Sequence, residues 1–176
     1  MKKHLFTLFL SLSFLGLQAQ YLPIFLKYDG INGDVAVTRF RDHVEIFDLS
    51  YNVATNILSN STETTPIVKQ PSSPGLITFY NVINKSTPAT SNKFYTGALI
   101  AKIEIKLTKG IDEPIYCVLT LEECKIASIQ NFGDNQEKIQ ILATKFKVTY
   151  TPYNNIGQAQ TPVTRGWDYV TNLQNN

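Results

Sequence analysis

The segment from Lys85 to Leu107 constrains the fold of this chain most, because it predicts one short helix followed directly by one long strand. Ser86 or Thr87 can cap the start of the helix, since a side-chain oxygen there accepts an otherwise unpaired backbone N–H. Pro88 suits the first helical position, where its missing N–H costs nothing. Gly97 is expected to end the helix, because a residue with positive φ is usually needed at that point.

The residues that follow Gly97 alternate between apolar and charged side chains. Such an alternation is typical of a strand with one face against a core and the other in water. We therefore expect one strand up to Leu107 with all of its apolar residues on one face. The apolar positions are Leu99, Ala101, Ile103, Ile105 and Leu107, and the charged positions are Lys102, Glu104 and Lys106.

The rest of the chain also favours β structure, since aromatic and β-branched residues are plentiful and Pro, Gly, Asn and Thr interrupt them. A bulge is expected between Ile46 and Phe47, where the apolar phase shifts. Many strands, one helix and no alternation of strands with helices predict a mainly β protein, either an antiparallel barrel or a sandwich. Further strands are predicted at 22–28, 44–51, 76–82, 115–121, 125–130 and 139–150, the last with Leu142, Phe146, Val148 and Tyr150 in one phase.

The N-terminus has the pattern of a secretory signal peptide. Lys2 and Lys3 precede an apolar run over residues 5–17, and Ala19 supplies a small residue for cleavage. The run is shorter than the roughly 20 residues that a membrane span needs. We therefore expect residues 1–20 to be a signal peptide and residues 21–176 to form a single domain. The mature protein is expected to be secreted or periplasmic, with no membrane association after cleavage.

The net charge and the cysteines limit the ligands and cross-links that this chain can be expected to have. The formal net charge of +2 is too small to indicate binding to nucleic acid or to an anionic membrane. Cys117 and Cys124 are seven positions apart, so a continuous strand would point them to opposite faces unless Glu122 and Glu123 form a turn or bulge. The two cysteines can therefore be small buried apolar side chains, or they can be oxidised to a disulfide in an exported protein; both alternatives remain open. The chain contains no His or Cys cluster with the spacing of metal ligands.

Residues 52–75 are polar, with three prolines and many Ser and Thr. A long loop in a compact domain is usually functional or mobile, so this segment is predicted to be a loop that reaches a partner. A flexible surface loop without a partner is the alternative.

No catalytic constellation is predicted. His43, the one histidine outside the expected signal peptide, is expected on the surface of a strand, and acid–base catalysis needs partners that no motif here supplies. No serine lies in the setting of a nucleophile elbow, and there is no glycine-rich phosphate loop. The sequence therefore predicts no catalytic, cofactor-binding or metal-binding residue and no enzyme activity. Trp167 is expected either to pack the tail on the barrel or to lie at a subunit contact.

Four stretches of the chain, in the same order, resemble the Hcp family, whose members form the ring-shaped tube subunits of type VI secretion systems. Two expected features are missing, a Ser after the first turn and a His that often follows it; Phe40 falls near that His position and His43 does not match it. The stretches are 28–52, with Gly33-Asp34, Val44-Glu45-Ile46 and Ser50-Tyr51-Asn52; 86–107; 116–129; and 146–172, with Tyr150-Thr151-Pro152, Gly166-Trp167-Asp168 and Asn172.

The resemblance implies an antiparallel two-sheet β-barrel with one short α-helix beside it. It also implies a homo-hexameric ring, stacking of rings into a tube through the loop at 52–75, and a non-enzymatic structural role related to type VI secretion. The signal peptide conflicts with assembly in the cytoplasm, so an exported ring-shaped binding module that carries an effector or partner protein in its lumen is the alternative. A secreted enzyme on the same fold is the third hypothesis.

Overall fold

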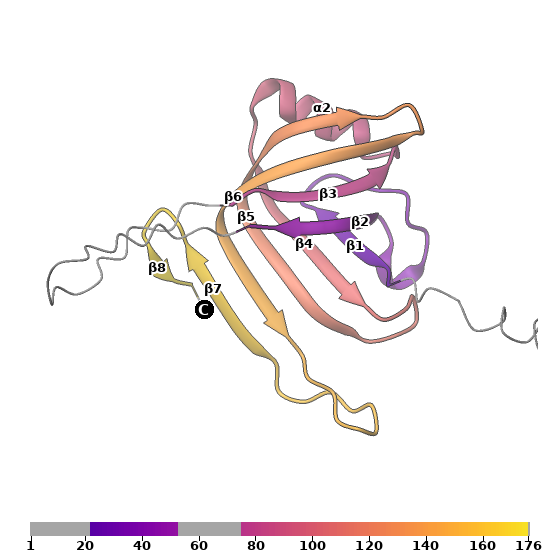
Figure 1. The fold of residues 1–176 in the computed structure, drawn as a ribbon, viewed down its shortest axis with the longest axis vertical. Coiled ribbons are helices and arrows are strands. Elements are labelled where there is room, and N and C mark those ends of the chain that lie inside the picture. The colour runs from indigo at the N-terminus through magenta and orange to yellow at the C-terminus, as the bar shows by residue number, and fades with distance from the viewer. Residues whose placement is uncertain (1–21, 53–74, 176) are drawn as a thin grey trace, which may run out of the picture.

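The computed structural model describes residues 22–52 and 75–175, and Figure 1 shows strands wrapped into a barrel with one helix beside them. The expected signal peptide, residues 1–20, and all but the ends of the expected loop at 52–75 lie outside the described residues. The elements are β1 (Ile24–Tyr28), the 3-10 helix η2 (Thr38–Phe40), β2 (Val44–Tyr51), β3 (Ile77–Val82), α2 (Thr87–Thr96), β4 (Ile100–Thr108), β5 (Ile115–Asn131), β6 (Gln136–Tyr150), β7 (Val163–Asp168) and β8 (Leu173–Gln174).

The strands form one antiparallel sheet that closes on itself. Their order is β3-β2-β1-β4-β5-β6-β7-β8, and β3 also pairs with β6. The first six strands in this order therefore make a closed barrel, and β7 and β8 continue the sheet beyond it. Closure removes the unpaired edges that the barrel strands would otherwise expose. The predicted mainly β fold, an antiparallel barrel with one short helix, is confirmed.

Two long strands connect the two sides of the barrel. The first part of β6, residues 136–141, pairs with β3, whereas residues 145–150 pair with β7. β5 pairs with β6 over nearly its whole length, but with β4 only up to Cys124. The strands bend where they change partners, and Glu123 sits at this point with a φ of 52°. Strands that switch between sheets by way of a bulge are a common way to turn the corner of a barrel.

The bend changes which side chains face the core. In β5, Leu121 and Cys124 are both buried although they are three residues apart, and Ile100 and Ile103 are both buried in β4. The strict alternation predicted for 99–107 is therefore wrong at its beginning, where Leu99 is 51% exposed. In β6 the buried positions are 137, 139, 141 and 143, and Leu142 is exposed. The prediction of separate strands at 115–121 and 125–130 is also wrong, since the bulge bends one strand without ending it.

The barrel interior is filled by aliphatic and aromatic side chains. A single cluster of buried residues runs through all six barrel strands, which agrees with one hydrophobic core for a domain of this size. Its fully buried members include Leu26, Tyr28, Ile46, Phe79, Ile103, Ile105, Leu121 and Ile141.

Helix α2 ends as expected but begins differently. Gly97 has a φ of 64°, and the N–H groups of Gly97 and Ala98 donate to carbonyls of the last turn, as in a left-handed C-cap. Ser86 is the N-cap residue, yet its side chain makes no capping hydrogen bond and its Oγ bonds Oδ1 of Asn84 instead. The expected cap by Ser86 or Thr87 is therefore wrong, because both side chains are engaged elsewhere.

A buried carboxylate joins the start of α2 to the barrel. Glu137 on β6 is 0% exposed, and its Oε1 accepts hydrogen bonds from Nδ2 of Asn81 at 2.7 Å and from Oγ1 of Thr87 at 2.8 Å. Oε2 of Glu137 and Oδ1 of Asn81 are buried without a hydrogen-bond partner among the described residues. Three elements, β3, β6 and α2, thus meet at one carboxyl group.

Candidate assembly surface

The segment between β1 and β2 folds back over the outside of the barrel. Phe25 alternates with the core residue Leu26 and so faces outward, yet it is only 2% exposed because Phe40 of η2 covers it. The two rings stack with their centroids 3.9 Å apart. Backbone hydrogen bonds from Val35 N–H to the carbonyl of His43, and from Asp42 N–H to the carbonyl of Val35, hold the segment in place.

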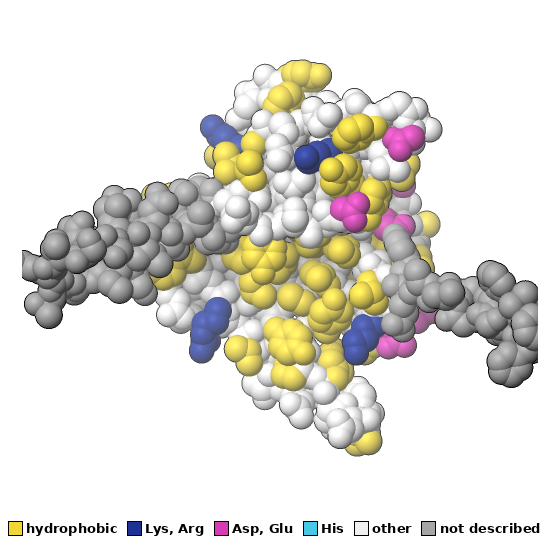
Figure 2. Space-filling model, viewed as in Figure 1, with side chains coloured by type: hydrophobic (Ala, Val, Ile, Leu, Met, Phe, Trp, Pro, Cys, Tyr) yellow, Lys and Arg dark blue, Asp and Glu magenta, His cyan; other side chains and the backbone are white. Residues whose placement is uncertain are grey.

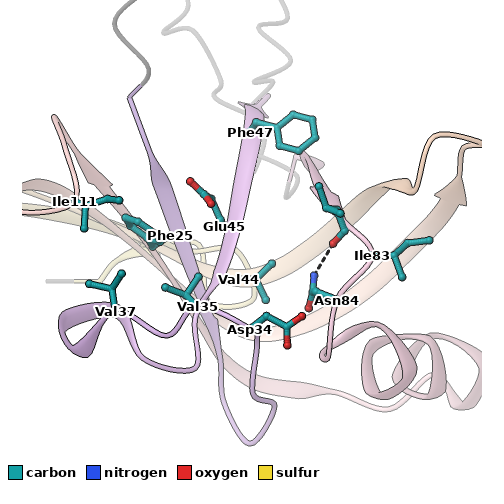
Figure 3. Close-up of a pocket in the computed structure, with 11 residues that line it drawn as sticks. Phe25, Asp34, Val35, Val37, Val44, Glu45, Phe47, Ile83, Asn84 and Ile111 are labelled. Atoms are coloured by element: carbon teal, nitrogen blue, oxygen red, sulfur yellow. Dashed lines mark hydrogen bonds between the residues drawn. The ribbon is translucent and has the colours of Figure 1, made fainter.

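A groove of about 440 Å³ lies between this segment, the starts of β1 and β2, the end of β3 and the turn after β4. In Figure 3, Phe25, Val37 and Ile111 lie on one side of it and Ile83 and Asn84 on the other, with Val44 and Glu45 between them. We call it the β1–β2 groove. Its lining is mostly apolar: Phe25, Val35, Val37, Val44, Phe47, Val82, Ile83 and Ile111, with Asp34, Glu45 and Asn84 as the polar residues.

Several apolar side chains of the groove are open to solvent. Val82 is 55% exposed, Ile83 45% and Ile111 46%. The polar residues are engaged in local structure: Asp34 Oδ2 accepts from Lys85 N–H, and Asn84 Nδ2 donates to the carbonyl of Val82. An apolar hollow in which two of the three polar residues are held by local hydrogen bonds is suited to receive an apolar surface of another protein.

His43 lies close to this segment but is buried, so the prediction of a surface histidine is wrong. The side chain is 7% exposed, and its ring meets the ring of Phe40 edge-on. Nδ1 donates to the carbonyl of Arg41 at 3.0 Å, which leaves Nε2 to accept from Nζ of Lys106 at 3.1 Å. Burial and the charges of Lys106 and Lys27 lower the pKa of His43 below its usual value. Both ring nitrogens of this neutral histidine are thus engaged in hydrogen bonds, one to a backbone carbonyl and one to the ammonium group of Lys106.

The other candidate reactive groups are also kept apart. Glu123 is exposed at the bulge, where it bonds Thr144 and Lys145. Cys117 and Cys124 both face the core, because the bulge at Glu123 restores the phase between them, and they are free thiols. Burial raises the pKa of Cys124 to about 12, which suppresses the reactive thiolate. In the part of the chain that the structure describes, no three metal-ligating residues come together and no helix is long and apolar enough to cross a membrane.

The C-terminal hairpin, residues 163–175, is a second exposed feature, and composition alone did not predict its strands. β7 pairs with β6, placing Trp167 opposite Phe146, and Leu173–Gln174 pairs back on β7. This pairing is consistent with Trp167 packing the tail on the sheet, and its role at a subunit contact stays a prediction. Asp168 of the Gly166-Trp167-Asp168 motif shapes the turn between β7 and β8, because its Oδ1 accepts hydrogen bonds from the N–H groups of Val170 and Thr171.

The family of the chain follows from its sequence as a whole. The family described as "Type VI secretion system effector, Hcp" matches residues 25–150, which is more than half of the chain and includes the six barrel strands apart from Ile24. The chain belongs to the Hcp family. No curated protein matches it by sequence.

Solved structures agree with the Hcp fold. A structure titled "Structure of a type six secretion system protein" superposes with a TM-score of 0.78 at 15% identity and covers 88% of this chain and 100% of its own. Hcp1 from Salmonella typhimurium gives 0.68 at 17% identity, covering 88% and 99%. A type VI secretion system effector from Yersinia pestis gives 0.64 at 17% identity, covering 82% and 98%. At such identities the likeness establishes the fold alone.

Proposed function

We propose that this protein is a non-enzymatic Hcp subunit that forms homo-hexameric rings, which stack into a tube related to type VI secretion. Membership of the Hcp family supports the general role. The observation that carries the proposal is the β1–β2 groove, since a closed barrel that worked alone would leave no reason for so many exposed aliphatic side chains in one hollow. Figure 2 shows further hydrophobic side chains gathered across the middle of another face, over β2, β4 and β5.

Assembly into a ring is also consistent with the presence of two different exposed surfaces on the protein. A ring built from identical copies joins two different surfaces of each copy, and it buries both by closing on itself. The groove and the C-terminal hairpin offer two such surfaces. The loop expected at 52–75 would then be free to contact the next ring.

Native mass spectrometry of the mature chain, residues 21–176, tests the proposal. We expect a six-copy species at micromolar concentration, and negative-stain electron microscopy is expected to show rings and short stacks. A chain that remains monomeric at high concentration would refute the hexamer. Deleting residues 55–73 should abolish stacks and preserve single rings, and unchanged stacks would refute the role of the loop.

An exported ring-shaped module is the second candidate function, because residues 1–20 have the pattern of an export signal. In that case the ring would act outside the cytoplasm, in the periplasm or the medium, and its lumen would hold an effector or partner protein. Mass spectrometry of the N-terminus of the protein recovered from the medium and periplasm separates the two candidates. A new N-terminus near Tyr21 favours the exported module, and an intact Met1 excludes cleavage.

A further inference from the structure

The C-terminal hairpin carries apolar side chains that remain exposed among the described residues. Val163 is 52% exposed, Val170 71% and Leu173 64%. β7 is paired along its whole length with β6, but on its other side only residues 167 and 168 pair with β8. The hairpin thus presents three aliphatic side chains and a partly open strand edge, a combination that promotes contact with another chain.

The hairpin and the β1–β2 groove lie on opposite sides of the molecule. In Figure 1, β7 and β8 are on the left, whereas the starts of β1 and β2, the end of β3 and the turn between β4 and β5 are on the right. The groove is built from these right-hand elements. The hairpin therefore cannot fill the groove of its own molecule, but it can reach the groove of a neighbour.

The charges of the two surfaces are complementary. The groove lining includes two acidic residues, Asp34 and Glu45, and no lysine or arginine. The hairpin carries one cationic residue, Arg165, which is exposed and donates a hydrogen bond to the carbonyl of its neighbour Thr164. Its one acidic residue, Asp168, already accepts hydrogen bonds from the N–H groups of Val170 and Thr171 within the turn. An arginine beside aliphatic side chains matches an apolar hollow with an acidic rim, and such complementarity favours one docking partner over others.

We infer that the C-terminal hairpin of one copy docks in the β1–β2 groove of the next copy. The occupant of the groove is thus a second copy of this chain, joined head to tail. A contact between two different surfaces either closes into a ring or grows as an open filament. The inference rests on the proposed hexamer, for which it names the contact between subunits.

Cross-linking tests the contact directly. The double variant I83C/V170C, treated with a short bismaleimide, should give a ladder of covalent species on a denaturing gel that ends at six copies. Each single variant, I83C and V170C, controls for contacts of either surface with itself and for reaction of Cys117. A double variant that is hexameric by native mass spectrometry, yet shows no more cross-linking than the single variants, would overturn the docking and leave the hexamer standing.

A second pair of variants makes the test independent of the cross-linker. V170D places a charge on the docking side chain and should raise the concentration needed for hexamer formation by at least about tenfold. I156D is the matched control, because Ile156 is 77% exposed on the loop between β6 and β7, outside the hairpin. Unchanged thermal unfolding of V170D would show that its fold is intact. V170D hexamers as stable as those of I156D would overturn the inference, whereas a monomeric wild-type chain would refute the proposed function itself.

Discussion

The rings of Phe25 and Phe40 stack face to face, with an interplanar angle of 14° and centroids 3.9 Å apart. Phe25 points out of the barrel, so this stack attaches the segment between β1 and β2 to the outer surface. Phe40 occupies the region where the family resemblance led us to expect a histidine. The groove exists because this segment stays on the barrel wall.

Replacing Phe40 with alanine should therefore loosen the segment and destabilise the protein. Removing a fully buried phenylalanine costs about 3–5 kcal/mol in general, and Phe40 is 0% exposed. Urea unfolding of F40A measures the loss. F132A is the control, because Phe132 is 38% exposed and should cost much less. Equal losses in the two variants would contradict the importance of the stack.

The buried Glu137 predicts an unusual order among its variants. E137A leaves the Asn81 amide and the Thr87 hydroxyl without their acceptor, which should cost about 1–3 kcal/mol for each unpaired group. E137Q keeps an acceptor oxygen and replaces the unpaired Oε2 by an N–H donor, next to an Asn81 whose Oδ1 lacks one. We expect E137Q to be clearly more stable than E137A in urea unfolding. The reverse order would show that the charge itself stabilises the junction.

The environment of His43 predicts a loss of stability in mild acid. Its pKa is lowered in the folded protein, so the unfolded chain binds a proton more readily and unfolding becomes easier as the pH falls. The contribution of His43 to the free energy of unfolding is complete above its pKa in the unfolded chain, about 6.5. It decreases as the pH falls from there toward the lower pKa of the folded protein. The charged groups that face the ring are Lys106 and Lys27, and Glu104 lies beside Lys106. The hydrogen bond from Lys102 lowers the pKa of Glu104 below its usual value, so this carboxylate stays ionised in mild acid.

Urea unfolding at pH 7.5 and 5.5 tests this expectation. The free energy of unfolding of the wild type should fall more between the two pH values than that of H43Q, which cannot titrate. Equal pH dependence in the two proteins would rule out His43 as the source.

Gly166 is expected to be necessary for the C-terminal hairpin. A Cβ there would overlap the backbone carbonyl oxygen of Asn175 and lie 2.9 Å from that of Phe146. G166A should therefore displace the chain after β7 and speed amide hydrogen exchange at Trp167 and Asn175. In the control G133A the new methyl group meets no atom within 4 Å, and exchange in the hairpin should be unchanged. Normal protection in G166A would contradict the close approach.

The two cysteines should not form a disulfide within one chain, even after export. They lie seven residues apart on one strand, a distance of roughly 23 Å at about 3.3 Å per residue, whereas a disulfide needs Cα atoms within about 7 Å. Alkylation with iodoacetamide before and after denaturation should give two labelled thiols only in the unfolded protein, with Cys124 unlabelled in the folded state. An intramolecular bond found by mass spectrometry would contradict the continuous course of β5 between the two residues.

The helix and most barrel strands were predictable from local patterns, because alternation and end signals depend on neighbours in the sequence. The choice of a barrel over a sandwich came from the family resemblance, and β7 and β8 were not predicted. The exposure of Leu99, Ala101 and Leu142 could not be predicted from such patterns. It depends on a bulge whose position is set by the pairing of β4, β5 and β6. His43 was misplaced for a similar reason: the residues that bury it, Phe40 and Lys106, come from distant parts of the chain. The groove could not be predicted either, because it is lined by five segments that meet only after the barrel closes.

The passage of β5 and β6 from one side of the barrel to the other has a mechanical consequence. β6 is bonded to β3 at its beginning and to β7 at its end, so the outermost hairpin and the barrel are parts of one continuous ladder. Inter-strand hydrogen bonds of antiparallel strands run across the strand direction. A force that pulls the hairpin along the direction of β6 would therefore act on the hydrogen bonds between β5 and β6 in shear. Many of these hydrogen bonds would share the force, instead of breaking one after another.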